Sequence, residues 1–133
     1  MDAQLRQGLA DVLPAVDQAM AELSFHKALT AIWGYVGLLN RYVDSTGPWA
    51  LAKDPALAGR LDEVLYHACE ALRALGLLVF PFLPNTGREI WKRLGLSKPT
   101  DEGRLDELTT WGGLPAGAQT ERGQSLFPRI DVA

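Results

Sequence analysis

The sequence has a single cysteine, Cys69, which excludes an internal disulfide framework and any Cys-x-x-Cys metal or redox motif. Long apolar runs are also missing, because the longest, around residues 77–82, is far too short to span a membrane. The amino-terminal residues lack the apolar core of a signal peptide. We therefore expect a soluble, cytoplasmic protein with no membrane contact.

The chain has no large excess of positive or negative charge. The chain carries 13 Lys and Arg against 16 Asp and Glu, a formal net charge of −3. Net charge therefore does not indicate a strongly basic nucleic-acid module. Cations nevertheless concentrate in residues 24–60 and 80–95. If the loop after residue 44 meets the second of these segments at one end of the fold, that end is basic enough to attract phosphates.

No run of residues predicts a sheet, whereas apolar residues recur at helical spacing. The spacing predicts helices over residues 3–23, 25–44, 57–80 and 86–94. The expected fold class is all-α, an antiparallel helix bundle with an irregular C-terminal tail. We assign residues 1–95 to the bundle and expect the tail, residues 96–133, to pack back on it.

Proline, glycine and serine mark the expected breaks between these helices. Pro14 lies inside the first helical pattern, where we expect a kink or a late helix start. Ser24 is placed to cap the second helix with its side chain. Gly47 and Pro48 stop that helix, and Pro48 suits the first position of a short helical turn.

Catalytic motifs are absent. No glycine-rich phosphate loop occurs, and Ser24-x-x-Lys27 matches an acyl-enzyme signature without its supporting motifs. We interpret Ser24 as a helix cap and Lys27 as an exposed lysine, and we assign no catalytic residue.

One helical pattern resembles half of a metal site. Glu63, His67 and Glu70 lie at i, i+4 and i+7, but Glu22 and His26 are the only weak candidates for a second half. We interpret the pattern as a solvated helix face with local pairing and assign no metal ligand.

The tryptophans differ in their setting. Trp33 and Trp91 lie within helical patterns and are expected in the core, with the indole N–H paired at its edge. Trp111 lies in the tail and can cover the bundle. Trp49 follows Pro48 at a turn, where it is either an exposed platform for stacking bases or a plug at the bundle end. The residues alone favour the plug, because tryptophan is commonly buried.

The segment from Asn40 to Lys53 reads Asn-Arg-Tyr-Val-Asp, then Pro-Trp, then Leu-Ala-Lys. It resembles the signature of the methionyl-tRNA synthetase family in its anticodon-binding domain. Further family-like segments appear in the right order at residues 25–33, 78–84, 90–95 and 126–131. The ordered set covers nearly the whole chain.

The resemblance implies a helix bundle of the class I synthetase type that recognises the CAU anticodon of methionine tRNA. It implies that Trp49 stacks on an anticodon base and that Pro48 shapes its loop. We add Lys53 as a nearby basic contact. Such a site reads unpaired bases by stacking and edge hydrogen bonds. We interpret Asn40 and Arg41 as structural residues that fix their helix against the Pro48–Trp49 loop.

The chain also departs from the family. The Asn-Leu-x-x-Arg segment of an earlier family helix is missing, as are the ATP-binding His-x-Gly-His and Lys-Met-Ser-Lys-Ser motifs. We therefore expect a fragment that cannot charge tRNA alone and has no cofactor of its own. ATP, and any zinc, would belong to a catalytic domain, which we expect as a partner beside the tRNA. The alternatives are the related bundles of the Ile, Val, Leu or Cys synthetases, and a helical protein-interaction scaffold without RNA binding.

Overall fold

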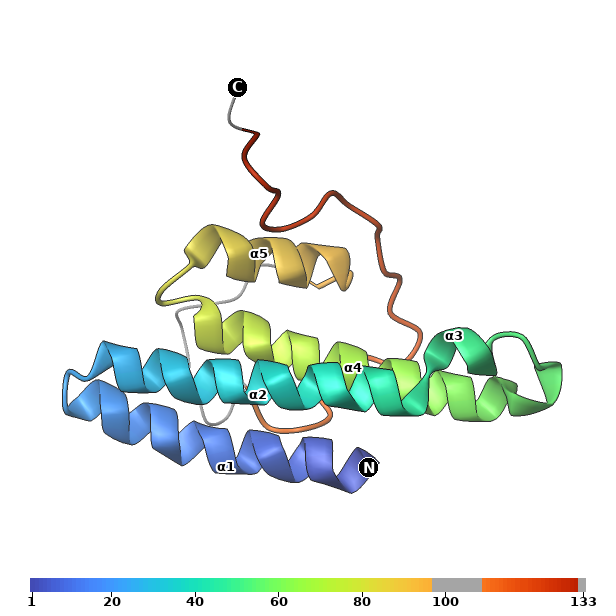
Figure 1. Cartoon of the computed structure of the whole chain (residues 1–133), viewed down its shortest axis with the longest axis horizontal. Helices are drawn as coiled ribbons and strands as arrows, with labels where there is room; N and C mark the ends of the chain where they lie inside the picture. Colours follow the sequence, from blue (N-terminus) through green and yellow to red (C-terminus); the bar gives the residue numbers. More distant parts are fainter. Residues whose placement is uncertain (97–108, 132–133) are drawn as a thin grey trace.

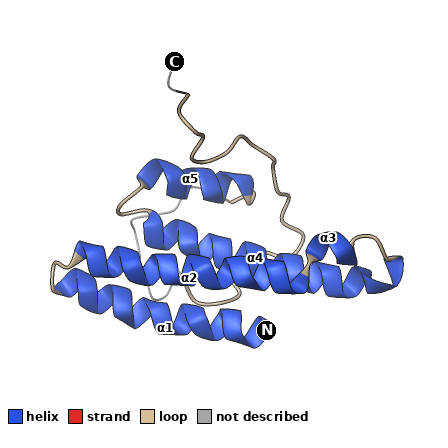
Figure 2. Ribbon diagram, viewed as in Figure 1, coloured by secondary structure: helices blue, strands red, loops and turns tan. Residues whose placement is uncertain are grey.

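The computed structural model describes residues 1–96 and 109–131, and within these ranges it contains helices but no strand (Figure 2). The elements in chain order are α1 (Asp2–Ala21), α2 (Phe25–Thr46), α3 (Pro48–Leu51), the 3-10 turn η1 (Pro55–Leu57), α4 (Ala58–Val79) and α5 (Pro84–Arg93). The all-α fold class predicted from helical spacing is confirmed.

The long helices form an antiparallel bundle. Figure 1 shows α1 and α2 running side by side in opposite directions, and α4 returns against both of them. The shorter α5 packs on α4, away from α1. The turn helix α3 lies at the far end of the bundle, beside the beginning of α4.

The helix α1 is continuous through Pro14. Proline has no N–H to donate to the carbonyl of Ala10, but Ala10 is exposed, so water can bind that oxygen. The helix begins at Asp2, and the alternative of a late start is therefore wrong.

The junctions around α2 follow the predicted breaks with one exception. Ser24 is the N-cap residue, but its side chain makes no capping hydrogen bond. The predicted side-chain cap is therefore wrong; the backbone N–H groups of Lys27 and Ala28 donate to the carbonyl of Ser24 instead. At the other end, Gly47 takes a left-handed φ of 54°, which a glycine adopts without strain, and Pro48 opens α3.

The predicted core placement of Trp33 is wrong, because this side chain is 49% exposed. The buried stripe of α2 runs through Ile32, Tyr35 and Leu39, and Trp33 lies one residue, or roughly 100°, off that stripe. Trp91 is half-buried, and its indole Nε1 donates to the carbonyl of Arg73 at 2.9 Å, which confirms the pairing expected at its edge.

Glu70 is the main structural surprise of α4. Its side chain is fully buried, so the predicted solvated face is wrong at this position. The Glu70 carboxylate accepts hydrogen bonds from Arg73 at 2.7 and 3.0 Å. It also accepts from the backbone N–H groups of Gly112, Gly113 and Leu114, at 2.8, 3.0 and 2.8 Å.

This ion pair holds the start of the described tail against α4. Arg73 donates to the carbonyl of Thr110 at 2.9 Å, and the Tyr66 hydroxyl donates to that of Leu114 at 2.8 Å. Burial by itself raises the pKa of the Glu70 carboxyl, but the hydrogen bonds and charge of Arg73, together with the backbone donors, bring it below its ordinary value. The carboxylate is therefore charged at neutral pH, and both of its oxygens accept hydrogen bonds from the fold.

The rest of the described tail leaves the bundle. The N–H of Glu121 donates to the carbonyl of Arg93 at 2.8 Å, and from there to residue 131 every residue is exposed. Figure 1 shows this segment rising beyond α5 toward the C-terminus. Residues 97–108 and 132–133 of the predicted tail lie outside the described residues.

Candidate nucleic-acid interface

The α3 end of the bundle presents Trp49 on a short, well-connected turn. The N–H groups of Ala50 and Leu51 donate to the carbonyl of Gly47, and the N–H of Ala52 donates to that of Pro48. The indole lies beside Gly47, where a Cβ would be 3.9 Å from the ring. Trp49 is 58% exposed, so the ring does not plug the bundle end.

The chain after α3 is equally constrained. Leu51 is half-buried against the core, which ties the turn to the bundle. The N–H of Asp54 donates to the carbonyl of Leu51, and the Asp54 carboxylate accepts from the N–H of Ala56 at 3.0 Å. An exposed aromatic ring therefore stands on a turn in which the N–H groups of residues 50–54 are hydrogen-bonded, so it would lose little conformational freedom on binding a flat ligand.

Lys53 lies in this turn, and its side chain is exposed. Within the described ranges it makes no ion pair, whereas the neighbouring cation Arg60 is engaged by Asp2 at 2.6 Å and by Glu63 at 3.2 Å. The ammonium group of Lys53 is therefore available to an anionic ligand close to Trp49.

Asn40 and Arg41 are both exposed on α2. Arg41 borders a shallow groove between α1 and α2, together with Gly8 and Leu38. Neither side chain makes a hydrogen bond or ion pair in the part of the chain that the structure describes, and no contact of either with Trp49 is seen there. The role we assigned them, fixing α2 against the Pro48–Trp49 loop, therefore stays a prediction.

The two basic segments seen in the sequence do not meet at one end. Arg88, Lys92 and Arg93 belong to α5, which packs on the later part of α4, through contacts such as Trp91 with Arg73. Figure 1 shows α3 and α5 well apart along the bundle. The positive charge beside Trp49 is thus local and modest.

Comparison with known proteins identifies this architecture. A sequence profile of the family described as the anticodon binding domain of methionyl tRNA ligase matches residues 1–132. The chain belongs to this family.

Relatives and solved structures agree with that assignment. The methionine–tRNA ligase of Caldanaerobacter subterraneus is 43% identical over 122 residues, which are 88% of this chain and 18% of that protein. That of Halalkalibacterium halodurans is 36% identical over 131 residues, 98% of this chain and 20% of that protein. The chain thus spans about a fifth of the length of these relatives.

A crystal structure of the apo form of Mycobacterium tuberculosis methionyl-tRNA synthetase superposes with a TM-score of 0.85 at 28% identity. The superposition covers 99% of this chain and 26% of the synthetase chain. The bundle type expected from the resemblance is confirmed. These matches favour the methionyl family over the related bundles of the other class I synthetases that the sequence left open.

In this anticodon-binding domain, an ion-pair cluster that the sequence did not reveal lies near the α3 end. Arg60 at the start of α4 donates to both carboxylate oxygens of Asp2 at 2.6 and 3.0 Å, and the Tyr42 hydroxyl donates to Asp2 at 2.8 Å. The hydrogen bond from Arg60 is the main cause that holds the pKa of Asp2 well below its usual range. The cluster joins α1, α2 and α4, and so supports the turn that carries Trp49.

Two residues of the pattern that resembled half of a metal site have other contacts in this domain. Among the described residues, no group of three or more His, Cys, Asp or Glu side chains is arranged to hold a metal. His67 Nδ1 lies 2.7 Å from the carbonyl of Glu63, and Glu70 is committed to the tail. No described helix has both the length and the apolar character to cross a membrane.

Proposed function

We propose that this chain recognises the CAU anticodon loop of methionine tRNA, as the anticodon-binding part of a methionine–tRNA ligase. The observation that carries the proposal is Trp49, an indole that is 58% exposed on a constrained turn. Exposed aromatic rings stack on unpaired bases, and proteins read RNA loops in this way. The names of the relatives support methionine tRNA as the ligand.

The proposal gives the neighbouring residues distinct roles. Pro48 and the left-handed Gly47 set the angle at which the indole faces solvent. Lys53 contacts the phosphate backbone, because its ammonium group has no acidic partner within the described ranges. The chemistry of charging, with its ATP, belongs to a catalytic domain that this chain would serve. A cytoplasmic location stays a prediction.

Replacing Trp49 with alanine should weaken the binding of a CAU anticodon stem-loop by about 1–3 kcal/mol, because one stacked base loses its platform. That loss corresponds to a rise in the dissociation constant of roughly 5- to 150-fold. The measurement is a titration of a complete ligase that carries this chain, with fluorescence or calorimetric detection.

Phe127 provides a matched control for this experiment. It is another exposed aromatic side chain, 61% accessible, in the C-terminal tail and not on the α3 turn. Phe127→Ala should leave the affinity for the stem-loop unchanged. Equal affinities of wild type and Trp49→Ala would remove Trp49 from the interface, and a loss in both variants would point to general damage to the fold.

Replacing Lys53 with glutamine should weaken CAU and scrambled loops alike, because a phosphate contact carries no base information. The plot of log affinity against log salt should become shallower by about one unit, since one fewer counterion is released. Lys27→Gln, a change of another exposed lysine in the first turn of α2, is the control. A salt dependence identical to wild type would place Lys53 outside the contact.

A further inference from the structure

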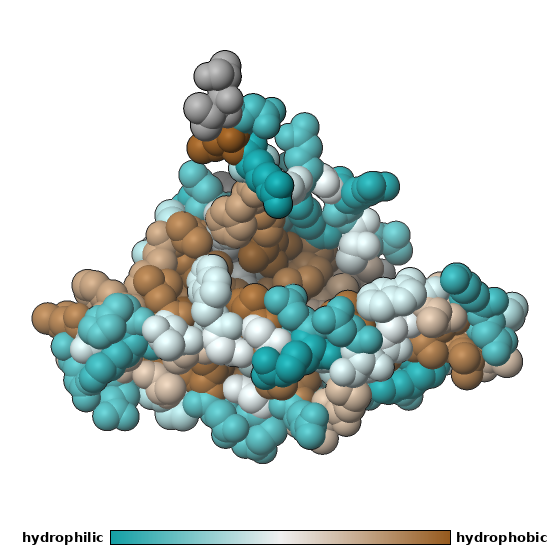
Figure 3. All heavy atoms as spheres, viewed as in Figure 1, coloured by the Kyte–Doolittle hydropathy of each residue, from teal (hydrophilic) through white to brown (hydrophobic). Residues whose placement is uncertain are grey.

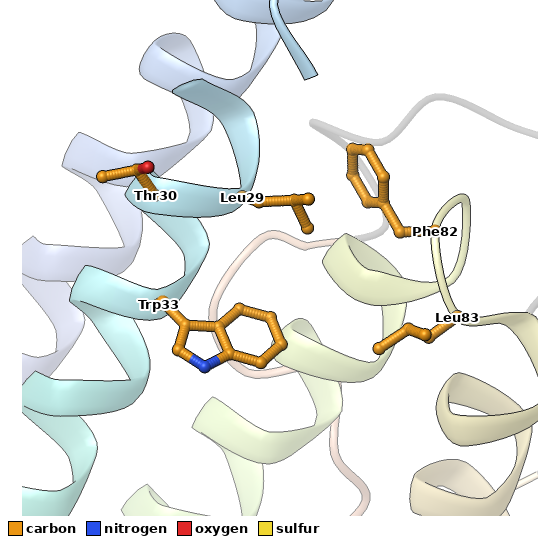
Figure 4. Close-up of a pocket in the computed structure, with 5 residues that line it drawn as sticks. All are labelled: Leu29, Thr30, Trp33, Phe82 and Leu83. Atoms are coloured by element: carbon orange, nitrogen blue, oxygen red, sulfur yellow. The ribbon is translucent and has the colours of Figure 1, made fainter. Parts of the chain in front are cut away.

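A second apolar surface lies on the bundle, away from Trp49. It is a hollow with a cavity volume of about 600 Å³, lined by Leu29, Thr30, Trp33, Phe82 and Leu83. Figure 4 shows Leu29 and Trp33 on α2 facing Phe82 and Leu83 in the turn between α4 and α5. Figure 3 shows hydrophobic residues gathered in a hollow on this face, between the long helices and the tail.

The chemistry of the hollow suits an apolar partner. Its one hydroxyl, on Thr30, already donates to the carbonyl of His26 at 2.7 Å. Phe25, half exposed, extends the wall through an edge-to-face contact with Phe82, with ring centroids 6.3 Å apart. Among the described residues, no lysine or arginine lines the hollow, so these residues offer no partner for a phosphate. Contiguous exposed apolar surface is typical of sites that bind another protein or an apolar ligand.

The position of the hollow separates it from the proposed RNA site. From Trp33 to Gly47 the chain follows α2 for about 14 residues, or roughly 20 Å at 1.5 Å per residue. An RNA loop on Trp49 therefore leaves Trp33 and Phe82 uncovered. Both residues are therefore open to a partner other than the anticodon loop.

The lengths of the relatives indicate what that is. The matched region makes up 18% and 20% of the two ligases and 26% of the solved synthetase chain. In proteins of this kind, roughly three-quarters or more of the polypeptide lies outside the domain. That polypeptide is the partner at highest local concentration, because it belongs to the same chain.

We propose that the hollow formed by Leu29, Trp33 and Phe82 is the seat on which the remainder of a methionine–tRNA ligase packs, through an apolar side-chain cluster that fills it. The proposal rests on the proposed function in one respect, that the chain works inside such a ligase. RNA recognition and domain attachment then use opposite ends of α2, so neither blocks the other.

Hydroxyl-radical footprinting with mass spectrometry tests this without a mutation. The oxidation rate of Trp33 is compared between this chain alone and a complete ligase that carries it. We expect Trp33 to react at least about fivefold more slowly in the ligase, because the core of a protein contact excludes water. Trp49 should react equally in both, and should become protected only when a CAU stem-loop is added.

Three results would overturn the proposal. Equal oxidation of Trp33 in the chain alone and in the ligase would show that nothing covers the hollow there. Protection in the chain alone that grows with concentration would assign the hollow to a second copy, and concentration-independent protection would assign it to the chain's own tail. Failure of the stem-loop to protect Trp49 would count against the proposed function alone, because the Trp33 comparison contains no RNA.

A variant locates the contact. Trp33→Glu changes an exposed side chain, so the bundle should still fold, and it places a charge in the apolar contact. In the complete ligase, Phe82 should then become as reactive as it is in the chain alone. A Phe82 that stays protected in this variant would show that the contact does not pass through the hollow.

Discussion

Replacing Glu70 with alanine should lower the free energy of unfolding by about 3–5 kcal/mol, because it breaks a buried ion pair whose closest N–O distance is 2.7 Å. The Arg73 side chain is 5% exposed and cannot turn to water without moving the tail. The backbone N–H groups of Gly112, Gly113 and Leu114 would also lose their acceptor. Chemical denaturation of the chain alone measures the loss.

The control for this change is Asp62→Ala, on the same helix. Asp62 is exposed and makes no ion pair in the described ranges, so its loss should change stability by no more than about 0.5 kcal/mol. A Glu70→Ala variant as stable as Asp62→Ala would show that the ion pair contributes nothing net. That outcome is physically possible, because burying two charges costs much of what their attraction returns.

The pH dependence gives this prediction a second readout. The pKa of the Glu70 carboxyl is lower in the folded chain than in the unfolded one, so the folded state binds its proton less readily. Its stabilisation is therefore present at neutral pH and is lost as the pH falls through the folded pKa. Glu70→Gln lacks this titration. The stability difference between wild type and Glu70→Gln should shrink steadily below about pH 4, near the ordinary carboxyl range.

The helices were predictable because local rules and the final fold agree. In α1, apolar residues at helical spacing, such as Leu5, Leu9 and Val16, became the core. The break at Gly47 and Pro48 was equally predictable from the sequence, since glycine adopts a left-handed φ without strain and proline suits the first position of a helix. The exposed turn that carries Trp49 follows from that break, although the sequence alone favoured burial of the ring.

The failures share one physical cause, which is that burial depends on elements distant in sequence. Glu70 read as a solvated position because its tail partners, Gly112 to Leu114, lie more than forty residues away. A hint was available: beyond Glu70, from Ala71 to Val79, the only charged residue of α4 is Arg73, and an isolated cation in an apolar stretch calls for a nearby carboxylate. The prediction for Trp33 was wrong in the opposite direction: the side chain was expected in the core and is exposed. A large apolar side chain suggests burial regardless of its angle on the helix.

The close approach of α5 to α4 at Gly87 gives the second large effect. A Cβ on Gly87 of α5 would lie 2.7 Å from the carbonyl oxygen of Gly76 on α4 and 3.3 Å from the Cα of Phe80. These are backbone atoms, so they cannot rotate away. Gly87→Ala should therefore lower the free energy of unfolding by about 1–3 kcal/mol, because α5 must move off α4 to make room.

The sign of this effect separates packing from helix propensity. Alanine is favoured over glycine within a helix by about 1 kcal/mol, so propensity alone predicts that Gly87→Ala stabilises the fold. Gly34→Ala isolates that contribution, because Gly34 lies inside α2 and a Cβ there would meet nothing within 4 Å. Thermal unfolding should show Gly34→Ala melting above wild type and Gly87→Ala below it. If both variants melted higher, the close approach of α5 would not be needed, and the turn that carries Phe82 would be free to move with it.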